Sequence, residues 1–300
     1  MLAIVFPGQG SQRRGMGEKL FDEVPEYASL EGEIDACLGY SVREMCIKDP
    51  ARQLSETQYT QPCLYIVNAL HFYKAIANGE RPRFLAGHSL GEYNALHAAG
   101  AFDLLTGLRL VQKRGELMSK VKNGGMAAVV GLDASRVIQL LQENGLAALD
   151  VANYNAPLQT VISGLVGDLE RAASVFTKAG AQLYMPLPVS AAFHSRYMRE
   201  VAQRFEEVLK SFTFSPLHTL VVSNVTGEPY PVADPSDTVR SFLVGQITSS
   251  VQWTRSVKYM FVHGATTFKE AGPGDVLSKL VEKMRQDNLL TTTSAQVVTR

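Results

Sequence analysis

The sequence predicts an α/β protein that is interrupted by a small α+β insert. In the first and last parts of the chain, short apolar runs alternate with helical stretches, which is typical of a parallel sheet covered by helices. Between about residues 124 and 190 the order becomes strand, helix, two strands, helix, strand, which is the ferredoxin-like order. We therefore expect a body formed by residues 1–123 and 191–286, a ferredoxin-like subdomain at 124–190, and a tail or linker at 287–300.

Turn residues and apolar spacing place the elements of the first part of the body. An apolar run at 2–6 ends at Pro7 in a glycine-rich turn, which predicts a buried strand. Pro62 stands where a helix can start, and Gly124 with Gly125 is expected to end a later helix. In chain order we expect a strand at 2–6, a helix at 60–77, a strand at 84–86, a helix from residue 92 and a helix at 104–121.

The remaining elements are predicted in the same way. In the insert we expect strands at 126–132, 147–153, 159–164 and 182–187, with helices at 134–143 and 169–179. After the insert we expect a helix at 195–212, strands at 220–224 and 267–270, and a helix at 276–286. The Gly and Pro residues between 225 and 266 predict a loop that connects the last two strands.

Composition excludes several classes of partner. The chain has 29 Lys+Arg and 29 Asp+Glu, so its formal net charge is zero and no overall field attracts a polyanion. We expect no nucleic acid as partner, because no Lys/Arg run is longer than Arg13-Arg14. We expect no membrane as partner, because no run approaches the roughly 18 apolar residues of a spanning helix. The amino terminus lacks the features of a secretory signal, so we expect a cytoplasmic protein. The spacing of Cys37, Cys46 and Cys63 fits neither a redox motif nor a zinc site, which predicts reduced thiols and no metal.

The strongest local signal for chemistry is the G-x-S-x-G motif centred on Ser89. It lies between a predicted strand and a predicted helix, an arrangement that exposes a serine hydroxyl on a tight elbow. The backbone N–H of Leu90, at the start of that helix, is suited to stabilising an oxyanion. A glycine-lined turn with a capping serine is the alternative.

A nucleophilic serine needs a base, and the chain has six histidines. His194 follows the insert and precedes a predicted helix, and such loops at the ends of elements commonly carry reactive groups. A lipase or esterase would place an acid between the serine and a histidine near the end of the chain. Here 106 residues follow His194, since the chain has 300, and no such acid is evident.

Eight short motifs together resemble the malonyl-coenzyme A:acyl carrier protein transacylases. In order they are FPGQGSQ (6–12), TQP (60–62), GHSLGE (87–92), QKRG (112–115), NYNAP (153–157), FHS (193–195), VQW (251–253) and EAGPG (270–274). The resemblance covers residues 1–286 and is greatest to the discrete, trans-acting acyltransferases of modular polyketide synthases. It implies a hydrolase-like parallel-sheet body and an active site in the cleft beside the insert.

The resemblance also implies a mechanism. Ser89 matches the family's nucleophile and His194 its general base, which a backbone carbonyl orients in place of a carboxylate. Gln9 and Leu90 match the oxyanion hole. No cofactor would be bound permanently: malonyl-coenzyme A is the implied donor, and an acyl carrier protein brings the phosphopantetheine thiol that accepts the malonyl group. Such covalent transfer predicts ping-pong kinetics.

Further matches concern the acyl group. Arg114 matches the arginine that binds the malonate carboxylate, for which a guanidinium is well suited. Leu90 and Phe193 resemble members that select malonyl, and Gln61 and Asn155 match polar positions near the pocket. The segment 246–250, where a backbone carbonyl for the histidine is expected, departs from the family because Ser249 and Ser250 replace a proline-containing pair.

Several alternatives remain open at this stage. The housekeeping fatty-acid transacylase shares the chemistry, and an acyl hydrolase acting on carrier proteins shares the serine and histidine but characteristically lacks the arginine. A noncatalytic docking module is disfavoured because Ser89, His194 and the glycines are all present. We expect a monomer whose acidic carrier protein meets a local basic patch. Candidates for that patch are Arg13, Arg14, Arg196 and Arg199.

Overall fold

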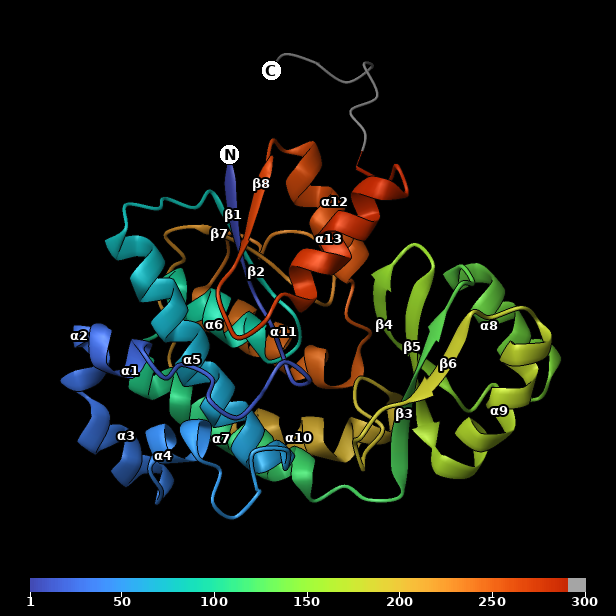
Figure 1. Cartoon of the computed structure of the whole chain (residues 1–300), viewed down its shortest axis with the longest axis horizontal. Helices are drawn as coiled ribbons and strands as arrows, with labels where there is room; N and C mark the ends of the chain where they lie inside the picture. Colours follow the sequence, from blue (N-terminus) through green and yellow to red (C-terminus); the bar gives the residue numbers. More distant parts are fainter. Residues whose placement is uncertain (291–300) are drawn as a thin grey trace.

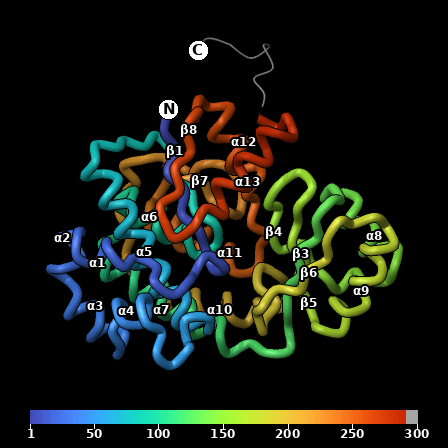
Figure 2. Tube along the Cα trace, viewed as in Figure 1, coloured from blue at the N-terminus to red at the C-terminus, as the bar shows by residue number. Residues whose placement is uncertain are grey.

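The computed structural model describes residues 1–290 and has two parts. Figure 1 shows a larger body, which contains both the first and the last elements, beside a smaller insert. The tube in Figure 2 shows the chain leaving the body after α7 (Leu104–Ser119) and returning before α10 (Arg199–Leu209). The expected α/β body with an inserted α+β unit is confirmed.

The body is built on a four-stranded parallel sheet. Its strands, in the spatial order β7-β2-β1-β8, are β7 (Leu220–Val222), β2 (Phe84–Gly87), β1 (Leu2–Phe6) and β8 (Thr267–Glu270). Side chains of β1 alternate between the two faces: Ile4 and Phe6 join one hydrophobic cluster, while Ala3 and Val5 join another. Both faces are therefore buried, as parallel sheets require.

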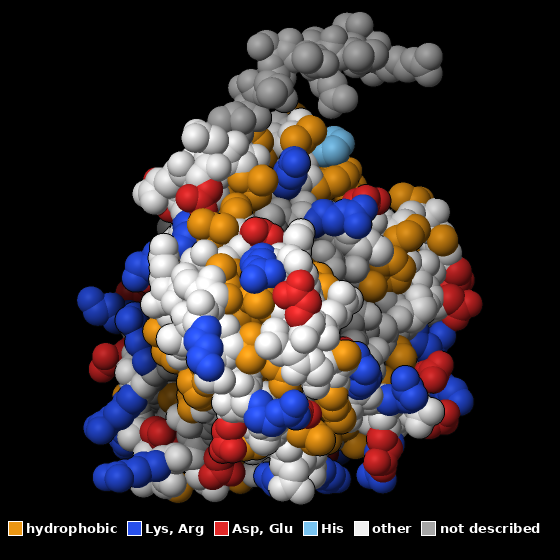
Figure 3. Space-filling view, turned by 90° about the vertical axis from the view of Figure 1, so that its right-hand side faces the viewer, with side chains coloured by type: hydrophobic (Ala, Val, Ile, Leu, Met, Phe, Trp, Pro, Cys, Tyr) orange, Lys and Arg blue, Asp and Glu red, His pale blue; other side chains and the backbone are white. Residues whose placement is uncertain are grey.

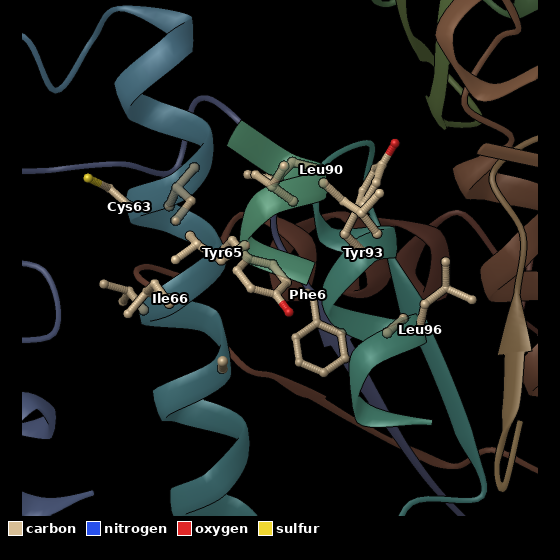
Figure 4. Packing of buried hydrophobic residues seen from close by; sticks show 14 of the residues in the cluster. Phe6, Cys63, Tyr65, Ile66, Leu90, Tyr93 and Leu96 are labelled. Atoms are coloured by element: carbon tan, nitrogen blue, oxygen red, sulfur yellow. The ribbon is translucent and has the colours of Figure 1, made fainter. Parts of the chain in front are cut away.

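Helices cover the sheet on both faces. α5 (Thr57–Ala77), α6 (Gly91–Ala98) and α7 contribute to the larger cluster, and Figure 4 shows Tyr65 of α5 directed towards α6 beside Phe6. The opposite face is covered by α12 (Trp253–Val262) and α13 (Val276–Gln286). The other helical elements of the body are α1 (Leu20–Glu23), α2 (Pro25–Ala28), α3 (Glu31–Leu38), α4 (Val42–Ile47), α11 (Pro235–Thr248) and the 3-10 turn Arg196–Met198 before α10.

The insert has a separate antiparallel sheet with the order β4-β5-β3-β6. Its elements are β3 (Gly124–Val130), α8 (Ala134–Glu143), β4 (Asp150–Ala156), β5 (Gln159–Leu165), α9 (Val166–Lys178) and β6 (Leu183–Pro186). This is the ferredoxin-like order that the sequence predicts. We propose 124 and 190 as the limits of this subdomain, since the Gly124 N–H donates to the Ser190 carbonyl at 3.3 Å where the chain enters and leaves.

The Pro and Gly residues expected to start one helix and to end another have different places in the structure. α5 begins at Thr57, so Pro62 lies inside the helix and does not start it. Gly124 and Gly125 belong to β3, and α7 has already ended at Ser119. Glycine is needed at 124 because a Cβ there would lie 2.4 Å from the Ala192 nitrogen.

The loop predicted between residues 225 and 266 is wrong, because this segment contains α11 and α12. Asp234 caps α11 by accepting from the Asp237 N–H, and Pro235 occupies its first turn. These are ordinary helix-start signals. The apolar stripe that follows these signals is weak, because only four residues of α11 are buried. For this reason the sequence pattern does not reveal the helix.

The surface, the cysteines and the chain end complete the description of the fold. Figure 3 shows Lys/Arg and Asp/Glu side chains mixed on the face that bears the insert. No helix in residues 1–290 is long and apolar enough to cross a membrane, and no His, Cys, Asp or Glu cluster in this range could hold a metal. The three cysteines are free. Of the expected tail, Leu289 and Leu290 pack on the α12 and α13 side, and 291–300 lie outside the described residues.

Candidate active site

The G-x-S-x-G motif forms a strained elbow between β2 and α6. Ser89 has φ of 52°, a left-handed conformation that costs energy for a residue with a side chain. A Cβ on Gly87 would lie 1.8 Å from the carbonyl carbon of Gly91, and one on Gly91 would lie 2.0 Å from the Phe6 oxygen. Both glycines are therefore required for the chain to turn here and to pass over β1.

Asn224, which sequence reasoning missed, braces this elbow. Its Oδ1 accepts the Ser89 N–H at 2.6 Å, and its Nδ2 donates to the Gly87 carbonyl at 2.5 Å. Asn224 comes just after β7, the neighbour of β2 in the sheet. Because the carboxyl ends of parallel strands meet at one edge, a polar residue after a strand was the available signal.

His194 meets Ser89 in the geometry of a nucleophile and its base. Its Nε2 lies 2.8 Å from the Ser89 Oγ, and its Nδ1 lies 3.0 Å from the Gln246 carbonyl oxygen and 3.2 Å from that of Ser249. Carbonyl oxygens only accept, so Nδ1 carries the hydrogen and Nε2 is left to accept from the serine. The segment 246–250 supplies both carbonyls, although it lacks the proline common in the family.

The surroundings keep this imidazole neutral. His194 is 4% exposed, and burial together with the nearby Arg114 charge lowers its pKa to about 3. Both causes disfavour the protonated ring. The base is therefore unprotonated, and able to take a proton, across the ordinary pH range.

Arg114 brings a buried positive charge to the nucleophile. It lies on α7, is 1% exposed, and its Nη2 donates to the Ser89 Oγ at 3.0 Å. Its Nη1 donates to Gln61 Oε1 at 2.7 Å, and its guanidinium lies 5.4 Å from the centre of the Tyr93 ring. Among residues 1–290 no carboxylate lies within 4.0 Å of it. A buried cation without a direct counter-ion favours an anionic ligand.

Gln246 connects the base and the arginine; its segment was expected to supply a backbone carbonyl, but its side-chain role was not predicted from the sequence. Its backbone oxygen accepts from His194, while its side-chain Oε1 accepts from Arg114 Nη2 at 3.0 Å. Its Nε2 donates to the Ser89 carbonyl at 3.0 Å and to the buried carboxylate of Glu92. One residue near the end of α11 thus contacts Ser89, Glu92, Arg114 and His194.

Most of the predicted site residues line one cavity of about 250 Å³ between the body and the insert. The predicted residues in its wall are Gln9, Ser89, Arg114, Asn155, Phe193 and His194. Gln61 is not among them, because it lies behind Arg114, and the Leu90 side chain is fully buried in the core. A more open cleft of about 840 Å³ also borders His194, but Ser89 and Arg114 do not line it.

Asn155 ties the insert to the elbow. Its Oδ1 lies 2.8 Å from Nε2 of His88, the residue before Ser89, and Nδ2 of the nearby Asn153 lies 3.3 Å from the same nitrogen. Gln9 is held by a bond from its Nε2 to Thr57 Oγ1 at 3.1 Å. Both side chains are therefore engaged by the protein itself as well as bordering the cavity.

Residues 3–229 match the family described as the acyl transferase domain. The chain belongs to this family. It is 50% identical over 289 residues to the polyketide biosynthesis malonyl CoA-acyl carrier protein transacylase PksC of Bacillus subtilis, covering 96% of this chain and 98% of that protein. It is 37% identical to the malonyl CoA-acyl carrier protein transacylase of Escherichia coli, with 94% and 92% covered.

A solved structure of another acyl transferase provides the comparison in three dimensions. It is a malonyl-transacylase in complex with its type II PKS acyl-carrier protein, 33% identical to this chain, with a TM-score of 0.88. The match covers 95% of this chain and 93% of that one. The body and the insert of the acyl transferase domain described here therefore share a common arrangement with that enzyme.

Proposed function

We propose that the protein transfers a malonyl group from malonyl-coenzyme A to the phosphopantetheine thiol of an acyl carrier protein. The observation that carries this proposal is the environment of one atom: the Ser89 Oγ contacts a neutral base, His194, and a buried cation, Arg114. The base suits an acyl transfer and the cation suits an acyl group with a free carboxylate.

In the first half-reaction the Ser89 Oγ attacks the thioester carbonyl carbon of malonyl-coenzyme A. His194 Nε2 takes the hydroxyl proton, and the carbonyl oxygen becomes an oxyanion. When the intermediate collapses, the C–S bond breaks and the proton passes from His194 to the departing thiolate. The products are free coenzyme A and a malonyl ester on Ser89.

The second half-reaction reverses the roles. His194 takes the proton of the phosphopantetheine thiol, the sulfur attacks the ester carbonyl, and the Ser89 oxygen leaves and recovers the proton. No permanently bound cofactor is needed for either step. The malonyl carboxylate would stay on Arg114 throughout, since the guanidinium can hold it by two parallel hydrogen bonds.

The remaining site residues have supporting roles in this proposal. The Leu90 N–H at the start of α6 and the turn at Gln9 form the oxyanion hole, where N–H groups stabilise the developing charge. Gly8 allows this close approach, because a Cβ there would lie 2.3 Å from the His88 oxygen. Phe193, in the cavity wall, restricts space beside the α-carbon and disfavours a branched donor. Gln61 supports Arg114.

We propose that the carrier protein served belongs to a polyketide pathway. The higher identity to the polyketide enzyme, 50% against 37%, supports this choice over the housekeeping alternative. The acidic carrier would meet exposed arginines. Among residues 1–290, Arg13, Arg14 and Arg199 form no ion pair, whereas Arg196 is paired with Asp150. We also propose that the protein acts as a monomer.

Labelled donors test the proposal directly. The protein is incubated with labelled malonyl- or acetyl-coenzyme A, and the covalent adduct is measured. We expect a stable malonyl adduct that is absent in Ser89→Ala, with Ser119→Ala as a control serine at the end of α7. No adduct with either donor would contradict the proposal. Transfer from malonyl-coenzyme A to a panel of polyketide and fatty-acid carrier proteins then tests the pathway.

A further inference from the structure

A buried carboxylate lies one turn after the nucleophile and is fully satisfied by hydrogen bonds. Glu92, in the first turn of α6, is 0% exposed. Its Oε1 accepts from the Asn224 backbone N–H at 3.1 Å and from the Tyr230 hydroxyl at 2.8 Å, and its Oε2 accepts from Gln246 Nε2. Burial raises the pKa of the Glu92 carboxyl, and the hydrogen bonds from Gln246, Tyr230 and Asn224 act in the opposite direction by stabilising the carboxylate.

Glu92 determines which way the Gln246 amide faces. A carboxylate accepts only, so it requires the amide nitrogen of Gln246 on its own side. The same nitrogen donates to the Ser89 carbonyl, and the amide oxygen is thereby turned to Arg114 Nη2. The three side chains form one chain of alternating polarity: carboxylate, amide, guanidinium.

This arrangement compensates the charge of Arg114 without occupying its binding face. Burial lowers the pKa of the Arg114 guanidinium, and the nearby Glu92 charge acts in the opposite direction by favouring the protonated form. A carboxylate bonded directly to Arg114 would compete with a substrate carboxylate, whereas one separated by a neutral amide leaves donors free. The Nε of Arg114 has no protein partner.

We propose that Glu92 is a positioning residue for donor selection: by fixing the Gln246 amide it aims Arg114 at the substrate carboxylate. This rests on the proposed function, in which Arg114 binds that carboxylate. Glu92 itself does not touch substrate. Its effect is therefore specific to donors that carry a carboxylate.

Glu92→Gln is a sharp test because it changes polarity with almost no change in volume. The new amide keeps its oxygen where the Asn224 and Tyr230 donors lie, so its NH₂ faces the Gln246 NH₂. Gln246 relieves this conflict only by turning its own NH₂ to Arg114 and its oxygen to the Ser89 carbonyl. Each of the two arrangements leaves like groups facing each other.

The measurement is kcat/KM for malonyl- and acetyl-coenzyme A in the full chain. We expect Glu92→Gln to lower the malonyl-to-acetyl ratio about tenfold, mainly through a raised KM for malonyl-coenzyme A. Glu92→Asp keeps the polarity and is expected to keep the ratio within about threefold. Tyr230→Phe, which removes one bond to the same carboxylate, serves as the matched control with an unchanged ratio.

The malonyl-to-acetyl ratios of these variants decide whether Glu92 positions Arg114. An unchanged ratio in Glu92→Gln, or equal losses in the Gln and Asp variants, overturns the proposal and assigns Glu92 to packing alone. If Glu92→Gln does not fold, Gln246→Met decides: it removes the side-chain amide but keeps the backbone carbonyl for His194, and an unchanged ratio again overturns it. If the wild-type protein forms no malonyl adduct, the proposed function fails instead.

Discussion

The two halves of the site are held in place by different kinds of atoms. His194 is oriented by backbone carbonyls, from Gln246 and Ser249, whereas Arg114 is held by the side-chain amides of Gln61 and Gln246. Main-chain support survives substitution as long as the segment keeps its path, but side-chain support depends on residue identity. The base should therefore tolerate changes around it, and the arginine should not.

The largest expected effect comes from removing the base itself. His194→Ala should lower the rate of self-acylation by about 1,000-fold, because within residues 1–290 no other base contacts the Ser89 Oγ. Rapid-mixing measurement of the acylation burst checks this. His218→Ala, on a histidine remote from the site cavity, is the control. A near-normal burst in His194→Ala would remove His194 as base.

Removing the buried cation should change donor choice more than chemistry. Arg114→Ala is expected to lower the malonyl-to-acetyl ratio of kcat/KM by about 100-fold, since the substrate carboxylate would be buried without a partner. The exposed Arg109 on the same helix provides the matched control, Arg109→Ala. If Arg114→Ala keeps the wild-type malonyl-to-acetyl ratio, Arg114 does not select the donor, and its support by side-chain amides has no bearing on donor choice.

The two halves are also coupled through charge, which a pH profile reveals. The pKa of His194, about 3, lies far below the ordinary value, so acetylation by acetyl-coenzyme A should stay nearly constant from pH 8 down to about 5. Acidification stops the reaction only when the ring is protonated. Arg114→Gln removes a charge that lowers this pKa, so its acid limb should move to higher pH.

Acetyl-coenzyme A is used for that profile because it carries no acyl carboxylate to titrate or to bind Arg114. The readout is the burst rate against pH for both proteins. An acid limb near pH 6.5 in the wild type would contradict a neutral, buried base. Identical limbs in the two proteins would show that Arg114 does not act on His194.

The smallest effect is expected where support comes from the main chain. Ser249→Ala leaves the carbonyl that accepts from His194, so kcat/KM for malonyl-coenzyme A should stay within about twofold of wild type. Steady-state kinetics suffice to measure this. A loss of more than about tenfold would mean that the side chain, and not the backbone, orients the base.

Local patterns made much of this protein predictable. The strand, turn and helix around Ser89 lie within a few consecutive residues, and β8 and α13 have the bounds expected from apolar spacing. The motif resemblance predicts that Gln9, Arg114 and His194 belong to one site, and in the structure all three line the same cavity.

The parts that sequence reasoning missed depend on distant contacts. Glu92 and Gln246 are 154 residues apart, and nothing local to either indicates the bond between them. The sequence predicts that Gly124 ends a helix, but glycine is required there because the backbone of Ala192 passes close by. Asn224 is missed for a related reason, since its role becomes visible only when β7 lies beside β2. The helix α11 is missed because only four of its residues are buried and its apolar stripe is weak.

The hydrogen bond between Gly124 and Ser190 makes the insert a natural unit for engineering. Because the chain enters and leaves the insert at one hydrogen-bonded point, we expect that the whole unit can be exchanged between related enzymes by joining the chain at only two places. The graft must retain the asparagines of β4 that hold His88, and a body partner for the bridge between Asn153 and Val251. Such chimaeras would vary the wall of the cavity while the reacting groups stay on their native scaffold.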